Sequence, residues 1–529
     1  MAEHVPGGPP GAVHLVGGRE PAYNGRVELD LRDRLAEYPP IMLEAIADSW
    51  RISLTDEQVP DIIERLASEL TRGESVHRAV RRLGKAERDA LAYISSVGQV
   101  RAHVLTRKFG EIRRLGPGRL EWEEAWQSPI SPAERLWFMG LICREYGVDG
   151  PYHGEVYFVP SEVRLALPPL HVSLPEFRVE AAEPPPVTRE AGDAFARDVF
   201  AVLCHLRNHS VRGRQGILAR HELGRLRPRL TSDRSPRLEL LHHLCLCAGL
   251  VRRQDGLWRP TSQASGWLRS SAQGRHRLLF HAWLADTDWN ELCLMPTVSC
   301  DDTGWRCDPV LARKAVVSYL ARCAVGVWST VASLIDSIYQ VDADFLRPDG
   351  DYEAWYIRDV TTGQYLTGFR SWRQVEGALI RYLLQYPLLW LGIVAMGQLR
   401  RGELAVSFRV TDEGADTLQT WEAGSSSDVG HESHAKPALP LVLGSDLSLT
   451  ASLEGSWYDR FLLERFARWI KEDEHVACYV LDKESVQVAL ADGITAGQIE
   501  SFLRRATKGR VPSEVLRALR AWSRAVDGR

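Results

Sequence analysis

The sequence predicts a mainly α-helical protein with small β-hairpins, an α+β fold class, and three observations support this prediction. Apolar side chains recur at helical spacing along much of the 529-residue chain. Short apolar runs joined by turn dipeptides, such as Asp255-Gly256, follow several of these helices. Apolar residues make up 45% and charged residues 25% of the chain, a balance that excludes disordered, collagen-like and coiled-coil proteins.

Breaks in composition divide the chain into domains. Residues 1–22 are rich in Gly and Pro and are expected to be flexible. Three consecutive prolines at 184–186 oppose both helix and sheet. Residues 422–440, rich in Gly, Ser and His, are typical of a linker. The predicted domains are a helical or winged-helix domain at 23–180, a second, Arg-rich winged-helix domain at 188–300, a third winged-helix-like domain at 301–421 and a small α/β domain at 441–529.

The first block shows the element order of a winged helix-turn-helix domain. Helices are expected at 85–97, 102–109 and 131–146, because apolar residues there recur at helical spacing. A turn at 149–150 and a strand at 155–159 then complete a short hairpin.

The same order is expected twice more. Helices at 193–207, 216–226 and 236–248 precede a hairpin over 250–260. In the third block, helices at 309–324 and 330–339 precede a hairpin of 352–358 with 364–368, and a helix at 372–386 follows. The sequence therefore predicts tandem winged helices. A generic helical array with hairpins stays open as the alternative, because periodicity does not separate the two.

Charge is distributed unevenly along the chain. The net charge is only −4, which taken whole argues against a nucleic-acid binder. Residues 78–119 nevertheless carry 11 basic against 3 acidic side chains, and residues 197–283 carry 16 Arg against 5 acidic side chains. Both basic segments coincide with predicted winged helices, which suits contact with phosphates.

The strongest candidates for such contact are basic residues in and around the second predicted helix of each of the first two blocks. Arginine is suited to this role because its guanidinium binds phosphate through two parallel hydrogen bonds. The alternative is that these arginines pair with acidic residues across domain interfaces. The candidate nucleic-acid-binding residues are Arg107, Lys108, Arg113, Arg114, Arg212, Arg214, Arg220, Arg225, Arg227 and Arg229.

No catalytic pattern emerges from the sequence. A P-loop, a GxSxG motif, an HExxH motif and a dinucleotide fingerprint are all absent, so we predict no catalytic residue, no cofactor and no enzyme activity. Acidic residues cluster at 342–353, and Asp349 with Glu353 faintly resembles a metal-dependent nuclease. Because Trp355 occupies the position where such a nuclease has lysine, a solvated acidic loop is the favoured interpretation.

Cysteine usage indicates a reducing compartment. The nine cysteines form no tight paired framework, so reduced thiols and a cytoplasmic location are expected. His242, His243, Cys245 and Cys247 lie within six residues, and Cys293, Cys300 and Cys307 recur at equal spacing. Neither set has the usual ligand spacing of a zinc site, so buried thiols are favoured and no metal is predicted.

Targeting and membrane segments are not expected. The N-terminal residues lack the basic start and continuous apolar core of a signal peptide. The longest strongly apolar stretch, residues 386–397, is too short to cross a bilayer.

Several strings resemble a known family. FGEIRRLGPGRLEWEEAWQSPISPAERLWFMGLICREY and RPDGDYEAWYIRDVTTGQYLTGFRSWRQVEGALIRYLLQYPLLWLG are similar to bacterial proteins associated with XPB-type helicases. Residues 441–525 resemble the N-terminal domain of those helicases more sharply. In that domain the resemblance implies a helix over 459–469, a strand ending at 479–481, and helices at 485–491, 496–505 and 512–522. Asp482-Lys483-Glu484 departs from the usual Thr-Pro of that pattern, and no motor lobes are present.

These observations lead to one functional hypothesis and two alternatives. The leading hypothesis is a non-catalytic accessory protein that binds duplex or junction DNA and contacts a helicase or repair partner, with no membrane or small-molecule ligand. The first alternative is a protein-interaction scaffold of genome maintenance or phage defence. A metal-dependent nuclease is the third.

Overall fold

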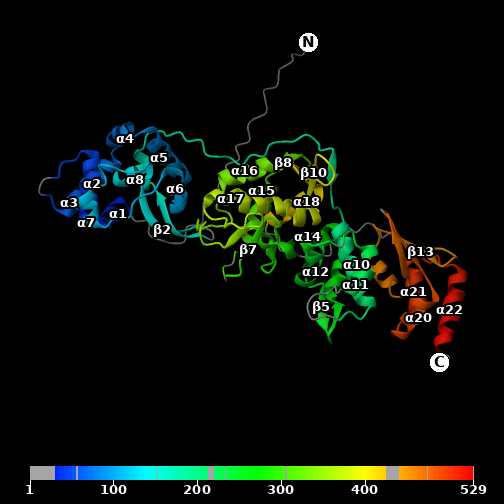
Figure 1. Ribbon diagram of the computed structural model, residues 1–529. Helices are drawn as coiled ribbons and strands as arrows, with labels where there is room; N and C mark the ends of the chain where they lie inside the picture. The colour runs from blue at the N-terminus through cyan, green and yellow to red at the C-terminus, as the bar shows by residue number, and fades with distance from the viewer. Residues whose placement is uncertain are drawn as a thin grey trace, which may run out of the picture. The chain divides into compact units, whose positions relative to one another are not determined.

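The computed structural model describes residues 30–54, 57–149, 152–212, 220–232, 234–303, 305, 307–423, 440–473 and 475–527, without the side chains of 220, 221 and 524–527. The chain forms two compact units, Met1–Leu174 and Pro175–Arg529, and each is described by itself (Figure 1). Helices dominate both units, and all paired strands that are named below run antiparallel. The α+β class with small sheets is therefore confirmed.

The first unit starts with helices and ends on a small sheet. Its leading helices are α1 (Leu31–Ala36), α2 (Pro40–Trp50), α3 (Val59–Thr71) and α4 (Gly73–Arg82). The elements that follow are α5 (Lys85–Val97), β1 (Gln99–Arg101), α6 (Ala102–Phe109), α7 (Pro117–Glu123), α8 (Pro132–Phe138), β2 (Cys143–Asp149), β3 (Tyr152–Phe158) and α9 (Ser161–Ala166). The sheet order is β1-β3-β2. We call residues 85–158 the first module.

The helix predicted over 131–146 is wrong beyond Phe138. Gly140 adopts a left-handed backbone with φ of 65°, which ends the helical path. A Cβ at this glycine would lie 3.2 Å from Ile46, so the chain turns close to α2. Residues from Cys143 onward then form β2. Of the predicted turn at 149–150, Gly150 lies outside the described residues.

The second module, residues 194–260, repeats the order of the first. Its elements are α10 (Ala194–Asn208), α11 (Arg220–Leu226), the 3₁₀ helix η1 (Arg227–Arg229), α12 (Arg237–Cys247), β5 (Val251–Gln254) and β6 (Leu257–Pro260). Arg212 pairs with Leu257 as an isolated bridge, which places a short extended segment beside β6. Asp255 and Gly256 have φ of 51° and 78°, so the predicted tight hairpin turn is confirmed.

The third module, residues 309–410, has the same order again. It is reached through β4 (Val187–Arg189), α13 (Ser262–Arg269), α14 (Ala272–Ala285), η2 (Glu291–Leu294) and β7 (Val298–Cys300). Its elements are α15 (Pro309–Ala321), β8 (Ser329–Thr330), α16 (Val331–Val341), β9 (Ile357–Asp359), η3 (Phe369–Ser371), α17 (Trp372–Leu383), the π-helical η4 (Leu384–Leu388), β10 (Val394–Gln398) and β11 (Ser407–Val410), with α18 (Asp412–Glu422) after it.

The hairpin of the third module lies after α17, so the prediction that placed it at 352–368 is wrong. β9 pairs mainly with β7, while β10 pairs with β11 in a sheet of order β4-β10-β11-β8. All five residues of β10 are buried. A strand buried on both faces has no alternating pattern, so periodicity gave no strand signal at residues 394–398.

The C-terminal block, residues 440–527, has its own sheet of order β12-β13-β15-β14. Its elements are β12 (Val442–Leu443), β13 (Ser448–Ser452), α19 (Trp457–Leu463), β14 (Arg468–Glu472), β15 (Val476–Val480), α20 (Lys483–Ala491), α21 (Ala496–Ala506) and α22 (Ser513–Asp527). The helix expected to reach Trp469 ends at Leu463, and Trp469 lies in β14. The later helices lie within a few residues of their expected bounds.

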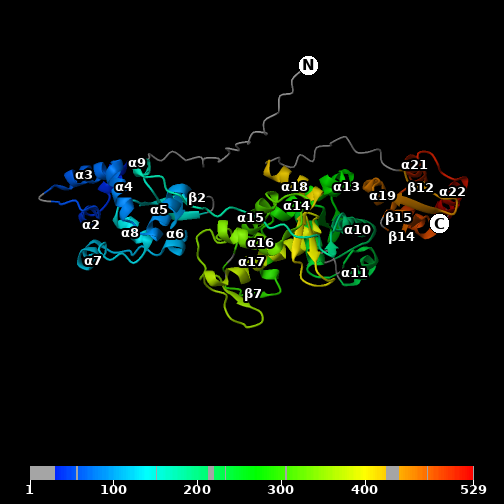
Figure 2. The ribbon, with the colours of Figure 1, turned by 90° about the horizontal axis from the view of Figure 1, so that it is seen from above.

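The largest hydrophobic core consists of buried residues drawn from the segment between Phe195 and Leu418, together with two residues of α19, Trp457 and Phe461. The Trp457 ring makes edge contacts with Phe200 at 5.4 Å and with Trp267 at 5.9 Å, so α19 packs beside α13 (Figure 2). The domain boundary expected between residues 300 and 301 falls inside this core, and the finer domain division stays a prediction. The expected flexible segment 1–22 and most of the linker lie outside the described residues.

Candidate nucleic-acid interface

The ten predicted contact residues have different surroundings. Four belong to the first unit and six to the second, and their interactions decide which of them face solvent. Arg214 lies outside the described residues, and the side chain of Arg220 is not described.

Arg113 forms its hydrogen bonds inside the first unit. Its guanidinium and backbone N–H donate to Glu134, whose side chain is fully buried, and its Nη2 also donates to the carbonyl oxygens of Ala125 and Ser128. The hydrogen bond to Glu134 raises the pKa of Arg113. This arginine holds the segment before α7 against the start of α8 and is occupied within the protein.

The other basic candidates of the first unit are more accessible. Arg114 is 74% exposed and pairs at 2.7 Å with Glu155 of β3. Lys108 is exposed at the end of α6, with its ammonium 5.2 Å from the centre of the Tyr93 ring. Arg107 is half-buried. Of the four predicted contact residues of the first unit, two are therefore exposed and two are half-buried.

Arg229 also binds inside the protein. Its two Nη atoms donate to both carboxylate oxygens of Glu464 at 2.7 and 2.8 Å, and its guanidinium lies 5.1 Å from the Trp469 ring. Burial opposes the charged form, but the charge and hydrogen bonds of Glu464 outweigh burial and raise the pKa of Arg229. Arg229 therefore pairs with an acidic residue inside the protein, which is the alternative to DNA contact that the sequence left open.

Helix α11 is anchored by a buried pair. His205 Nε2 lies 2.5 Å from a carboxylate oxygen of Glu222, which joins α10 to α11. Burial lowers the pKa of His205 despite this hydrogen bond. Arg225 on the same helix is 61% exposed, with its Nη1 3.8 Å from Glu222, and Arg227 is exposed in η1. Helix α11 and the adjoining η1 thus each present one of these arginines to solvent.

The hairpin of the second module adds arginines that the candidate list missed. The missed residues are Arg252 and Arg253, which are both exposed on β5. Arg212, which was predicted, is exposed on the segment that bridges to β6. Figure 1 shows this hairpin projecting from the helices of its module. Asp255 is the sole acidic residue of the sequence 251–260. The sequence signal was available, since a basic pair directly preceded the predicted Asp-Gly turn.

The third helix of each module contributes no basic surface comparable to the hairpin. Every residue of α8 is buried or half-buried. On α12 the basic residue Arg237 is buried and pairs with Asp198, and Glu239 and Leu246 are exposed instead. On α17 the described exposed residues are Arg373 and Gln374. Insertion of these helices into a groove is therefore not favoured.

The acidic segment 342–353 has structural partners. Asp344 is buried and accepts a hydrogen bond from the Tyr352 hydroxyl at 2.7 Å. Asp351 accepts from the backbone N–H groups of Glu353 and Ala354, which forms a local turn. Among the described residues, the one group with metal-ligand geometry lies elsewhere, at His243, Cys247 and Asp286.

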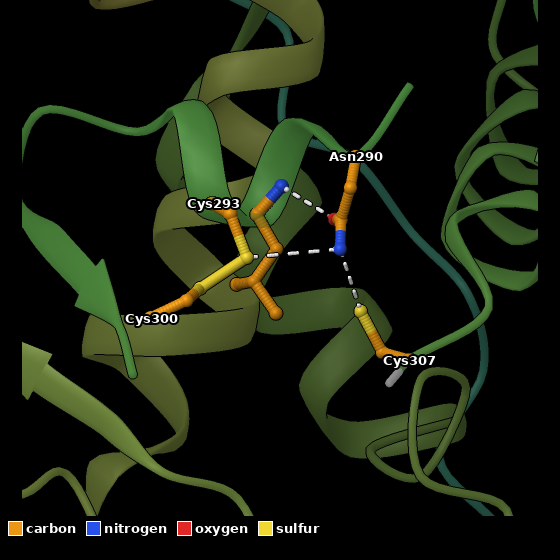
Figure 3. Close-up of a disulfide and its surroundings, with 5 residues drawn as sticks. Asn290, Cys293, Cys300 and Cys307 are labelled. Carbon is orange, nitrogen blue, oxygen red and sulfur yellow. Dashed lines mark hydrogen bonds between the residues drawn. A yellow bond between two sulfur atoms is a disulfide. The ribbon is translucent and has the colours of Figure 1, made fainter. Parts of the chain in front are cut away.

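One expectation about the cysteines is wrong. A disulfide joins Cys293 of η2 to Cys300 of β7, with their Cα atoms 5.5 Å apart (Figure 3). The Asn290 side-chain amide donates to Cys293 Sγ at 3.7 Å and to the free Cys307 Sγ at 3.3 Å. Equal spacing along the chain did not reveal this pair, because the turn from η2 to β7 brings the two residues together. The remaining seven cysteines are free.

In the part of the chain that the structure describes, no helix combines the length and the apolar content required to cross a membrane. No family model matches the chain, and the curated proteins contain no match to it.

Proposed function

We propose that the protein is a non-catalytic accessory protein that binds DNA, duplex or junction, mainly through phosphates. The contact surface would be the wing surface, which we define as Arg212, Arg252 and Arg253, with Arg225 and Arg227 of α11 and η1 as further contacts. The observation that carries the proposal is the exposure of these arginines on and beside a projecting hairpin.

The order of elements supports a winged-helix interpretation. Apart from α7 in the first module, η1 in the second and β9, η3 and η4 in the third, each module runs helix, extended segment, helix, helix and hairpin. In each module the first extended segment pairs with the last strand. In winged-helix proteins of this order the hairpin is the wing. The third module has exposed Arg400 and Arg401 between β10 and β11, at the place equivalent to the β5–β6 turn.

Binding through a wing has a consequence for specificity. Phosphate contacts position a protein on DNA without reading base edges, and they make affinity strongly salt-dependent. Because the third helices are largely buried, little base-edge contact is expected from them. We therefore propose binding with low sequence preference. The C-terminal block, which resembles the XPB-type helicase domain, would contact a helicase or repair partner.

A filter-binding titration of the full chain against a labelled mixed-sequence duplex tests the proposal. We expect measurable affinity at low salt, and we expect Arg252→Glu with Arg253→Glu to weaken it by at least about tenfold. Loss of two phosphate contacts should also reduce the slope of log K against log salt by about 2.

A matched charge reversal, Arg370→Glu with Arg373→Glu, serves as the control, since both arginines are exposed in the third module away from its hairpin. Affinity should stay close to that of the unaltered chain. Absence of binding to duplex and junction DNA at low salt would overturn the proposal, as would equal losses in the two double variants.

A protein-interaction scaffold is the second candidate. The observation that favours it is the burial of the third helices, because a winged helix whose recognition helix packs internally is better suited to binding proteins than to reading grooves. Failure of the DNA titration with a normally folded chain would favour this candidate.

A further inference from the structure

A His, a Cys and an Asp side chain meet in the second unit, and none of them belongs to the wing surface. His243 and Cys247 lie four residues apart on α12, so they share one face of the helix one turn apart. Asp286 is the C-cap residue of α14, which packs against α12. The histidines and cysteines of α12 are close together in the sequence, whereas Asp286 lies 43 positions beyond His243 and has no sequence signal that links it to them.

The three donor atoms are close enough to share one ion. One ligand atom from each residue lies within 4.8 Å of the other two, and His243 Nε2 is hydrogen-bonded to Asp286 Oδ2. Tetrahedral zinc with nitrogen or oxygen at about 2.0 Å and sulfur at about 2.3 Å separates its ligands by about 3.3–3.7 Å. Small side-chain rotations therefore suffice for coordination.

The surroundings hold the ligands in place. The Asp286 Oδ1 atom accepts a hydrogen bond from the Asp288 backbone N–H at 3.1 Å, and the Asp286 carbonyl accepts one from Arg313. Arg313 is fully buried and is fixed by its ion pair with Glu291. The Trp289 ring packs 5.2 Å from the His243 ring. Such outer contacts are what orients the ligands of known metal sites.

We propose that His243, Cys247 and Asp286 bind a divalent transition-metal ion of the zinc type. Imidazole nitrogen, thiolate sulfur and carboxylate oxygen together suit Zn²⁺, whereas Mg²⁺ and Ca²⁺ prefer oxygen alone. Three protein ligands leave one coordination position for water or an external donor. Cys247 is exposed, so the cluster can be reached from solvent on the side of this residue. The site is independent of the DNA proposal, because none of its ligands belongs to the wing surface.

Metal titration of the full chain tests this site. After removal of metal with a chelator and reduction of solvent-accessible thiols, Zn²⁺ or Co²⁺ alone is added, and Co²⁺ reports a thiolate ligand through its charge-transfer absorption. We expect the unaltered chain to show this band and Cys247→Ser to lose it. Asp286→Asn should weaken Zn²⁺ binding by at least about tenfold.

Two variants outside the cluster are the controls: Cys478→Ser removes a free thiol of the C-terminal block, and His242→Ala removes the neighbouring histidine of α12. Both should keep the cobalt band and the zinc affinity. Far-ultraviolet circular dichroism of the metal-free proteins checks that each variant folds, and Asp286→Asn serves if Cys247→Ser does not fold. An unchanged cobalt band in folded Cys247→Ser, or unchanged zinc affinity in folded Asp286→Asn, would overturn the proposal.

Discussion

Arg229 and Glu464, 235 positions apart in the sequence, form a two-pronged ion pair that joins η1 of the second module to the C-cap residue of α19 in the C-terminal block. The Glu464 side chain is 4% exposed and that of Arg229 15%. The Tyr479 hydroxyl donates a further hydrogen bond to Glu464 at 3.2 Å. A residue expected to touch DNA thus stabilises an internal interface.

Arg229→Ala is expected to destabilise the second unit. The substitution leaves the Glu464 carboxylate buried without its cation, which typically costs about 3 kcal/mol. Urea unfolding followed by tryptophan fluorescence measures the loss. Arg225→Ala is the control, because its exposed side chain should change the free energy of unfolding by less than about 0.5 kcal/mol.

A double variant, Arg229→Ala with Glu464→Gln, separates the ion pair from simple loss of packing. Neutralising the orphaned carboxylate should restore part of the lost stability. If the double variant loses as much free energy of unfolding as the two single variants together, the ion pair is not the cause of the destabilisation.

Gly414→Ala is expected to disrupt the contact of α18 with the end of β10. A Cβ at Gly414 would lie 2.2 Å from the Ile393 carbonyl oxygen, a backbone atom that cannot move alone. Overpacking of this kind costs about 1–3 kcal/mol. Gly224→Ala in α11 meets nothing within 4 Å, so it should be neutral or stabilising in the same thermal-unfolding measurement.

Reduction of the Cys293–Cys300 disulfide should lower stability. The bond closes a short loop, with a sequence separation of 7, and the chain-entropy relation for such a loop predicts about 2 kcal/mol. Cys293→Ser with Cys300→Ser should show the same loss and should no longer respond to reductant. A midpoint of urea unfolding that is identical with and without reductant in the unaltered chain would contradict the prediction.

Glu376 should make stability depend on pH. Burial raises its pKa to about 7, against the attraction of Arg347, whose Nε donates to it at 2.6 Å. Between the unfolded value of 4.5 and about 7 the folded state therefore binds more protons, so stability falls as pH rises through this window and levels off above it.

Glu376→Gln removes this titration. Urea unfolding at about pH 5 and about pH 8 measures how much free energy of unfolding is lost as the pH rises. This loss should be smaller in the variant than in the unaltered chain, by on the order of 2 kcal/mol. Glu403→Gln, at a partly exposed position, should leave the pH dependence as it is. An equal pH dependence in the unaltered chain and Glu376→Gln would contradict the assignment.

Local signals in the sequence predicted most of the elements that carry the modules. Helices α5, α6 and α10 lie within one residue of their expected bounds, because each has an apolar stripe and a distinct end. The Asp255-Gly256 turn was predictable from the dipeptide alone. The errors have separate causes. The helix expected through Tyr146 stops at the left-handed Gly140, and the third hairpin contains β10, which is buried on both faces and so lacks an alternating pattern.

The sequence predicted which module carries the candidate site, but it did not predict which individual arginines face solvent. Counting arginines identified the second module, yet it could not separate Arg229, which meets Glu464, from Arg252, which faces solvent. Pairing across such sequence distances depends on tertiary packing. For the same reason Asp286 had no sequence link to His243, and Cys293 had no evident link to Cys300.

Trp457 and Phe461 belong to the same core as Phe195, so the C-terminal block supplies part of the hydrophobic core of the second unit. The peptide chain between residues 423 and 440 is then not needed to hold the C-terminal block against the rest of the second unit. A chain cleaved between residues 423 and 440 should elute as a single species. The Arg275 guanidinium should still lie 3.9 Å from the centre of the Trp457 ring. Each fragment produced alone would expose the surface that the other fragment normally covers.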